Sequence, residues 1–301
     1  MWRVFLMYAL FGSIFSVGKI GVAASQPYFL TGMRMFLAGG LLMGYYSWRH
    51  GKRVFFSKQD WVLLALVAFF NVFITNAFEF WGLQYMSAGK TCLIYSLSPF
   101  AAAFIAYFFG TEKVSFKKCL GLGIGILSFC PLMLIPWLDG GQDVPSMELW
   151  AEGALTISAI TAVIGWTFVK KLTVERKMPH SIVNGVSFLL AGGMCLATSL
   201  AIETWDPLPV FAWTDFAISL FYIVVIHNLI CYSIYASALQ RFSVTFMAFA
   251  GLSNPIFAAF FGWLFLAESI TAAFWLAFAG VLVGLFLFYQ EEQRAIAINQ
   301  V

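Results

Sequence analysis

The sequence predicts an all-α integral membrane protein in which ten transmembrane helices form two inverted five-helix repeats around a central cavity. Three observations predict this fold. The 301-residue chain is 61% hydrophobic and only 10% charged, with a mean hydropathy of +0.87, whereas a soluble domain is about one-quarter charged. Ten apolar runs have the length of about 20 residues that a bilayer-crossing helix needs. A proline-containing stretch also occurs twice, 156 residues apart.

The ten predicted spans fill most of the chain. They run from Trp2 to Val22, Tyr28 to Trp48, Trp61 to Leu83, Ser87 to Phe109, Cys119 to Trp137, Leu149 to Phe168, Ser181 to Ile202, Phe216 to Leu239, Val244 to Leu266, and Ala272 to Tyr289. The connections are too short to hold a nucleotide-binding fold, and no GxxxxGK[ST] phosphate loop is present. The sequence therefore excludes an ATP-driven pump built from one chain.

The duplicated stretch sets a proline in the middle of two spans. The proline is followed thirteen residues later by a glutamate in both copies, Pro99 with Glu112 and Pro255 with Glu268. A proline removes a backbone donor and clashes with the preceding turn, so the neighbouring polar groups must supply other partners. These neighbours are Ser98 and Asn254. A polar group beside broken backbone in both halves predicts a transporter's binding region, with a packing kink as the alternative.

The duplication divides the chain into two units, 1–145 and 146–301. Because each unit contains five spans, an odd number, the second enters the membrane from the opposite side. Fourteen of the seventeen lysines and arginines fall at the termini or in the even-numbered connections. The positive-inside rule then places both termini in the cytoplasm. We interpret the net charge of +3 as a topology signal and expect no nucleic-acid partner.

The first span raises an alternative. Arg3 and the apolar run after it are also typical of a cleavable signal peptide. Lys19 inside the run favours a retained helix. Its spacing does too, because Lys19 precedes Pro27 by eight residues, as Lys171 precedes Pro179.

The pattern resembles the EamA-type branch of the drug/metabolite transporter superfamily. The resemblance rests on the two Pro-x12-Glu stretches, on Arg34 in the second span, and on small residues nine and sixteen positions after each glutamate: Gly121 and Ala277, Ser128 and Gly284. It implies a ten-helix carrier that moves small metabolites without ATP, with export the commoner direction. It also implies structural roles for Pro99, Pro255, Arg34, Glu112 and Glu268. Lys90 departs from it, because that family usually has a small residue there.

Charges inside the membrane are costly, so each needs a reason. Glu79 lies four residues before the end of its span and Lys90 three residues into the next. The two can form a structural ion pair, or they can bind the ammonium and carboxylate of a zwitterion at the external mouth. Lys19 either joins them or snorkels to the interface. Asn76 lies one turn from Glu79 on the same helix face.

A second group of candidates lies nearer the middle of the membrane. His227 is either a hydrogen-bonded packing residue or a group that contacts substrate or changes protonation, and Asn228 is next to it. Tyr95 and Trp166 are candidate stacking walls for a planar or cationic group. With Ser98 and Asn254 they complete the predicted substrate site.

We therefore expect a secondary carrier of the cytoplasmic membrane that exports or exchanges a small metabolite, such as an amino acid or a similar zwitterion. A larger cationic or nucleoside-like metabolite is the alternative substrate, and a channel or membrane enzyme the alternative class. We expect no enzyme activity, because no catalytic constellation such as a GxSxG or HExxH motif is present. We also expect no cofactor, and no metal site, because the five cysteines contain no CxxC pair. The expected partners are substrate and lipid, while a coupling proton and a monomer or homodimer stay open.

Overall fold

The computed structural model describes residues 2–51, 56–108, 116–128, 146–242, 244–267 and 269–299. Within these ranges the chain is helical, apart from turns and one isolated bridge between Ser25 and Val210. Glu112 and Glu268 lie outside the described residues, so their predicted structural roles stay predictions. The helices of the first half are α1 (Trp2–Ala24), α2 (Pro27–His50), α3 (Lys58–Leu66), η1 (Val67–Ile74), α4 (Thr75–Leu83), α5 (Ala88–Tyr95), α6 (Ser98–Phe108) and α7 (Phe116–Leu127).

The second half repeats this order. Its helices are α9 (Ser146–Lys170), η2 (Lys171–Glu175), α10 (His180–Ile202), α11 (Trp213–Tyr222), η3 (Ile223–Cys231), α12 (Tyr232–Ala238), α13 (Val244–Ala250), η4 (Gly251–Ser253), α14 (Asn254–Leu266) and α15 (Ala272–Asn299).

Among the described residues, five helices are long and apolar enough to cross a membrane. They are Leu6–Ala24, Lys58–Leu83, Met147–Glu175, His180–Ile202 and Trp213–Ala238. The sequence predicted ten. Part of the difference has a structural reason, because two predicted spans are each divided into shorter helices.

Both divisions fall immediately before the duplicated prolines. In the first half α5 ends at Tyr95 and α6 begins at Ser98. In the second half η4 separates α13 from α14. Each proline then occupies the first turn of the new helix, where its missing N–H costs no helical hydrogen bond. Serine hydroxyls satisfy the carbonyls freed at the breaks: Ser98 donates to the Tyr95 carbonyl and Ser253 to the Ala250 carbonyl.

Two further irregularities have the same spacing as the prolines. The π-helical segments η1 and η3 begin at Val67 and Ile223, 156 residues apart. A π-helical turn inserts a residue into the α-helical ladder, and such insertions are often found at functional sites. In η1 the widened turn presses Asn71 against α9, where its amide donates to the Ala162 carbonyl at 3.2 Å. A Cβ on Gly165 would lie 2.2 Å from the Asn71 Cβ, so this approach requires glycine.

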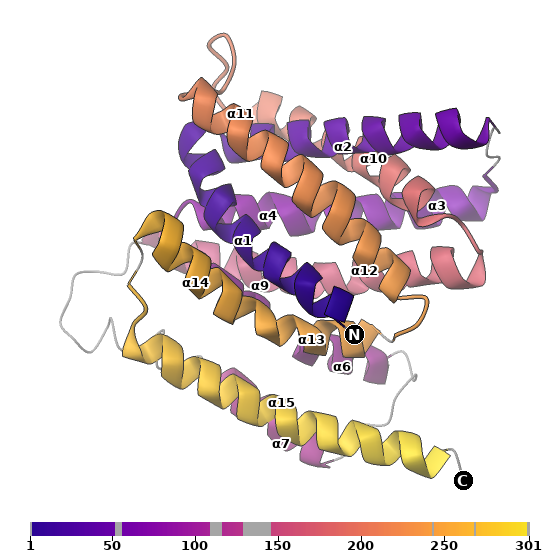
Figure 1. Ribbon diagram of the computed structural model, residues 1–301, viewed down its shortest axis with the longest axis vertical. Helices are drawn as coiled ribbons and strands as arrows, with labels where there is room; N and C mark the ends of the chain where they lie inside the picture. The colour runs from indigo at the N-terminus through magenta and orange to yellow at the C-terminus, as the bar shows by residue number, and fades with distance from the viewer. Residues whose placement is uncertain are drawn as a thin grey trace.

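The helices form a bundle with two outer pairs. Along one edge of Figure 1, α2 packs against α10, and at the opposite edge α7 lies beside α15. The helices α1, α4, α9 and α14 lie between these pairs. The breaks and the π-helical segments belong to this central layer or border it. The two outer pairs therefore frame the centre of the bundle.

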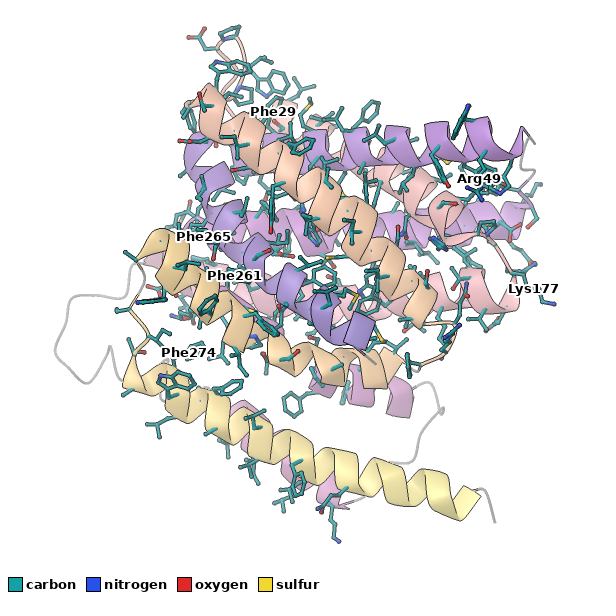
Figure 2. All side chains as sticks on the ribbon, in the orientation of Figure 1. Phe29, Arg49, Lys177, Phe261, Phe265 and Phe274 are labelled. Carbon is teal, nitrogen blue, oxygen red and sulfur yellow. The ribbon has the colours of Figure 1, made fainter. Side chains whose placement is uncertain are left out.

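The outside of the bundle suits lipid. Large apolar side chains such as Leu41, Phe221 and Trp263 are more than half exposed, and a bilayer covers such surfaces. Arg49, at the end of α2, and Lys177, after η2, lie together at one end of the bundle (Figure 2). The class of multi-pass membrane protein follows from the apolar surface and the spanning helices.

Candidate functional site

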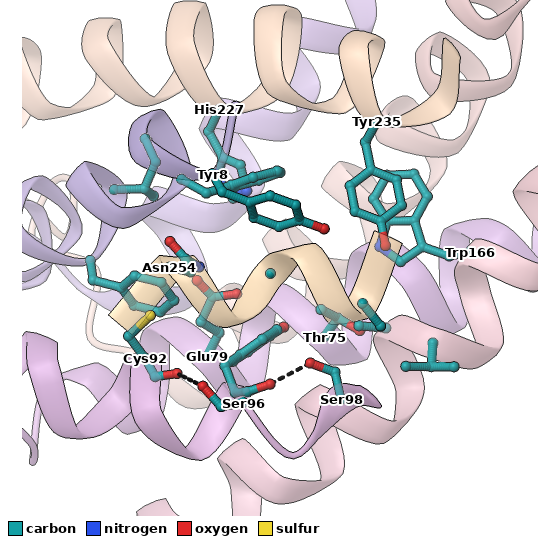
Figure 3. A pocket seen from close by; sticks show the side chains of 18 of the residues that line it. Tyr8, Thr75, Glu79, Cys92, Ser96, Ser98, Trp166, His227, Tyr235 and Asn254 are labelled. Atoms are coloured by element: carbon teal, nitrogen blue, oxygen red, sulfur yellow. Dashed lines mark hydrogen bonds between the residues drawn. The ribbon is translucent and has the colours of Figure 1, made fainter. Parts of the chain in front are cut away.

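A cavity lies at the centre of the bundle, between the broken helices and the π-helical ones (Figure 3). Its volume is about 100 Å³, several times the ~10–15 Å³ that one water needs. Its walls come from α1, α4, α5, α9, α12 and α14 and from the irregular segments beside them, so both halves of the chain contribute.

Six of the ten predicted substrate residues line this cavity. They are Glu79, Tyr95, Ser98, Trp166, His227 and Asn254. Two of them, Ser98 and Asn254, stand at the first positions of α6 and α14, where the broken helices open their N-terminal turns toward the cavity. The breaks therefore do more than kink the helices, since they put polar groups and helix ends at the bundle centre.

Glu79 is the carboxylate of the cavity lining, and it is almost fully buried. Its side chain interacts with the hydroxyl of Tyr95, and none of the described residues forms a salt bridge with it. Arg34 attracts it from a greater distance. The Tyr95 hydroxyl also lies 2.9 Å from the Ser158 hydroxyl, which donates to the Thr75 carbonyl at 2.6 Å. This chain of hydroxyls holds the carboxylate side of the cavity in place.

Arg34 lies behind the cavity wall with no exposed surface. Its guanidinium donates to Asn76 Oδ1 at 2.8 Å and lies 2.7 Å from His227 Nδ1. It also rests over the ring of Phe80, 4.0 Å from the ring centre. The resemblance implied a structural role for Arg34. Its hydrogen-bond partners among the described residues are side chains, Asn76 just after η1 and His227 within η3.

Aromatic rings form the wall opposite Glu79. Trp166 and Tyr235 are stacked with their ring centres 3.9 Å apart, and Tyr232 lies 5.1 Å from Trp166. The hydroxyl of Tyr8 donates to the Met247 carbonyl and so joins α1 to α13. Figure 3 shows the Trp166 and Tyr235 rings across the cavity from Glu79. Such a wall suits a planar or cationic group.

Lys90 does not pair with Glu79, so the predicted ion pair is wrong. Its ammonium lies 2.7 Å from Glu148 and 2.6 Å from Glu152, both in the first turns of α9. The physical reason is the direction of α5, whose first turn faces α9 while Glu79 on α4 faces the bundle centre. Lys90 does not belong to the cavity lining, and its charge joins two helices at one end of the bundle.

Three other predicted substrate residues also lie outside the cavity lining. The ammonium of Lys19 donates to the Met86 carbonyl in the connection between α4 and α5. Asn76 is buried behind Glu79, where it bonds Arg34 and donates to the Tyr232 hydroxyl at 3.1 Å. Asn228 is buried with its amide 2.7 Å from the Met35 sulfur. Proximity along a helix was therefore a poor guide to which side chains reach the cavity.

The sequence analysis missed several lining residues, among them Tyr8, Phe11, Phe15, Thr75 and Tyr235. The repeat spacing contained a signal for one of them. Tyr235 lies 156 residues after Glu79, and Gly251 lies 156 after Tyr95, and all four line the cavity. Applying the spacing of the prolines to every candidate would have found Tyr235. The residues from α1 carry no such signal, since phenylalanine and tyrosine are common in every span.

The described part of the chain contains no group of three or more His, Cys, Asp or Glu side chains arranged to hold a metal ion. The polar groups of the cavity are one carboxylate, one imidazole, an amide and several hydroxyls. This set offers charge, hydrogen bonds and stacking surfaces. The architecture is that of a multi-pass membrane protein with a partly polar internal cavity.

The chain belongs to the EamA-like transporter family, whose model matches residues 1–134 and 149–290. This finding confirms the resemblance to the drug/metabolite transporter superfamily. The family's name points to transporters and not to enzymes.

Relatives from two Chlamydia species match nearly the whole chain. An S-adenosylmethionine/S-adenosylhomocysteine transporter of Chlamydia muridarum is 36% identical over 98% of this chain and 92% of its own length. The transporter of the same name from Chlamydia trachomatis serovar L2 is 34% identical, over 98% and 90%. A solved crystal structure superposes with a TM-score of 0.68 at 15% identity, over 98% of this chain and 96% of the other. At this identity the superposition shows a shared fold.

Proposed function

We propose that this protein is a secondary carrier for S-adenosylmethionine, which it exchanges for S-adenosylhomocysteine across the cytoplasmic membrane. The single observation that carries the proposal is the match to relatives of that name at 34–36% identity over 98% of the chain. The aligned region spans all the helices that line the cavity.

The chemistry of the cavity supports the same substrate. S-adenosylmethionine combines a sulfonium cation, a purine base and an amino-acid end. Glu79 offers the cation a buried counter-charge. The stacked rings of Trp166 and Tyr235 offer the planar base a surface, and base stacking on aromatic side chains contributes about 1–3 kcal/mol.

The amino-acid substrate favoured by the sequence is not supported by these relatives. That prediction depended on Lys90 as the ligand of the substrate's carboxylate, and Lys90 is occupied by Glu148 and Glu152. The alternative in the sequence analysis, a cationic or nucleoside-like metabolite, agrees better with a carboxylate facing an aromatic wall.

Alternating access between two inverted five-helix units, 1–145 and 146–301, is the proposed mechanism. In its support, the helix breaks and the π-helical segments recur at the same spacing of 156 residues, and the family model matches the chain in two segments. Two similar units of opposite orientation can exchange conformations and thereby open a central cavity to each side in turn. We place both termini in the cytoplasm, in agreement with the position of Arg49 and Lys177 at one end of the bundle (Figure 2).

The test is counterflow in vesicles that contain the purified protein. Vesicles loaded with unlabelled S-adenosylhomocysteine should take up labelled S-adenosylmethionine with saturable kinetics. Vesicles that contain the protein but no internal S-adenosylhomocysteine should take up less. Protein-free vesicles are the control. The proposal fails if folded protein gives no uptake, if labelled amino acids enter equally well, or if flux rises without saturation, as it would through a channel.

A further inference from the structure

The contact between Arg34 and His227 determines which histidine nitrogen carries the proton. Arg34 lies 2.7 Å from Nδ1 of His227, and both side chains are buried. A guanidinium has five N–H donors and no acceptor. Nδ1 must therefore accept, and the ring's proton lies on the other nitrogen, Nε2. Arg34 thus fixes the imidazole as its neutral Nε2–H tautomer.

The second nitrogen has no competing partner within the described residues. His227 lines the cavity, and among the described residues its side chain hydrogen-bonds to Arg34 alone. Its ring is nearly perpendicular to that of Phe11, with the ring centres 5.2 Å apart, and its centre lies 5.3 Å from that of the Tyr232 ring. The imidazole is thereby held by rings on two sides and by a charge behind it.

We propose that His227 is a fixed hydrogen-bond donor of the substrate site, and that its Nε2–H contacts a ring nitrogen of the substrate's purine base. Arg34 is the positioning residue that sets the tautomer. This inference rests on the proposed function, because it names the part of a nucleoside substrate that His227 contacts.

The arrangement of rings selects the base over the other parts of the substrate. His227, Tyr232 and Trp166 follow one another with ring centres 5.3 and 5.1 Å apart, and Tyr235 stacks on Trp166. A neutral donor at the end of an aromatic wall matches a flat heterocycle that has acceptor nitrogens in its ring. A carboxylate is better matched by a cation, and the guanidinium of Arg34 lies behind the wall, turned to Asn76 and His227.

The contact with Arg34 opposes protonation of His227. Arg34 on α2 faces it directly, while Glu79 on α4, Tyr95 on α5, Tyr8 on α1 and Tyr232 on α12 share its cavity. A proton on Nδ1 would break the bond to Arg34 and set two cations 2.7 Å apart. We therefore infer that His227 stays neutral during transport and donates from Nε2 throughout, rather than changing its protonation.

The first experiment measures the tautomer without any substrate. The full-length protein, labelled with ¹⁵N-histidine, is placed in lipid nanodiscs and its imidazole nitrogens are recorded by NMR between about pH 5 and 8. The variant His227→Gln identifies the signals of that ring, and His50→Gln, outside the cavity, is the matched control. We expect an Nε2–H tautomer across the range. An imidazolium or an Nδ1–H tautomer at neutral pH overturns the inference.

The role of Arg34 has its own readout. In Arg34→Met the Nδ1 atom loses its donor, so the His227 signals should become pH-dependent between about pH 5 and 8. If the signals of this variant stay those of a fixed Nε2–H ring, Arg34 is not the positioning residue. Should that variant fail to fold, Arg34→Gln, which removes the charge but keeps a polar side chain, allows the same measurement, and its His227 signals should likewise become pH-dependent.

The second experiment tests the base contact. Analogues of S-adenosylhomocysteine that carry carbon in place of N1, N3 or N7 compete with labelled S-adenosylmethionine for the purified protein. One of the three should bind wild-type protein roughly three- to tenfold more weakly than the parent compound, as the loss of one hydrogen bond implies. In His227→Phe this difference should disappear.

The outcomes separate the two proposals. If wild-type protein binds S-adenosylhomocysteine but no analogue is weakened, or if His227→Phe keeps the discrimination, the base contact is overturned and the proposed function stands. If wild-type protein binds neither nucleoside, the proposed function fails, and the tautomer is still decided by NMR.

Discussion

Glu79→Gln removes a charge from the cavity with almost no change of shape. Glutamine has the volume of glutamate and keeps an oxygen that can accept from Tyr95. The wild-type carboxylate has no salt bridge to a described residue, so the substitution leaves no ion pair half-broken. Arg34 loses a distant attraction but keeps its bonds to Asn76 and His227. The effect on substrate binding should therefore exceed the effect on folding.

The magnitude follows from the contact that is lost. A hydrogen bond or ion contact to a charged group contributes about 1.5–3 kcal/mol, and each 1.4 kcal/mol is a factor of ten in affinity. We expect S-adenosylmethionine to bind roughly 10- to 150-fold more weakly to the variant. S-adenosylhomocysteine lacks the sulfonium charge, so its affinity should fall by no more than about threefold, the lower end of the contribution of a neutral hydrogen bond.

The assay is equilibrium binding of the two labelled compounds to purified protein in nanodiscs, with thermal unfolding recorded in parallel. Glu175→Gln, an exposed residue of η2, is the matched control and should bind both compounds as wild type does. The reasoning is refuted if the variant binds S-adenosylmethionine normally, or if both affinities fall by the same factor while the thermal midpoint is unchanged.

Three further predictions concern other parts of the bundle. Trp166→Ala should weaken binding of S-adenosylmethionine by roughly 5- to 150-fold, because stacking of the base contributes about 1–3 kcal/mol; unchanged affinity in the same binding assay would exclude the stacking wall. Gly165→Ala should lower the free energy of unfolding by about 1–3 kcal/mol, since its Cβ would meet Asn71 at 2.2 Å, whereas Gly193→Ala, with nothing within 4 Å, should not; equal thermal midpoints would contradict this packing. Lys90→Met should also destabilise the protein, by about 1–3 kcal/mol after allowance for partial exposure, and adding Glu152→Gln should restore part of the loss; a midpoint that falls further in the double variant would count against this ion pair.

Parts of the fold could be predicted because they depend on local chemistry. The apolar runs specified helices, and Pro99 and Pro255 specified where two of them break, since a proline cannot continue a helix without losing a hydrogen bond. The site was predicted less well. Glu79 was found because a charge inside the membrane is costly and therefore conspicuous, and Tyr95 as a candidate aromatic stacking wall near the middle of the membrane. Lys90 was misplaced because its partner depends on the direction of its helix face.

The sequence by itself determined the membrane class, the family and the repeat spacing of 156 residues, because composition and periodicity are properties of the chain. Only the tertiary structure decided which polar groups meet. Asn76, just after the π-helical segment η1, and His227, within the π-helical segment η3, both meet Arg34. No periodicity in the sequence marks such a turn, because its stability comes from the helices packed around it and not from the residues within it.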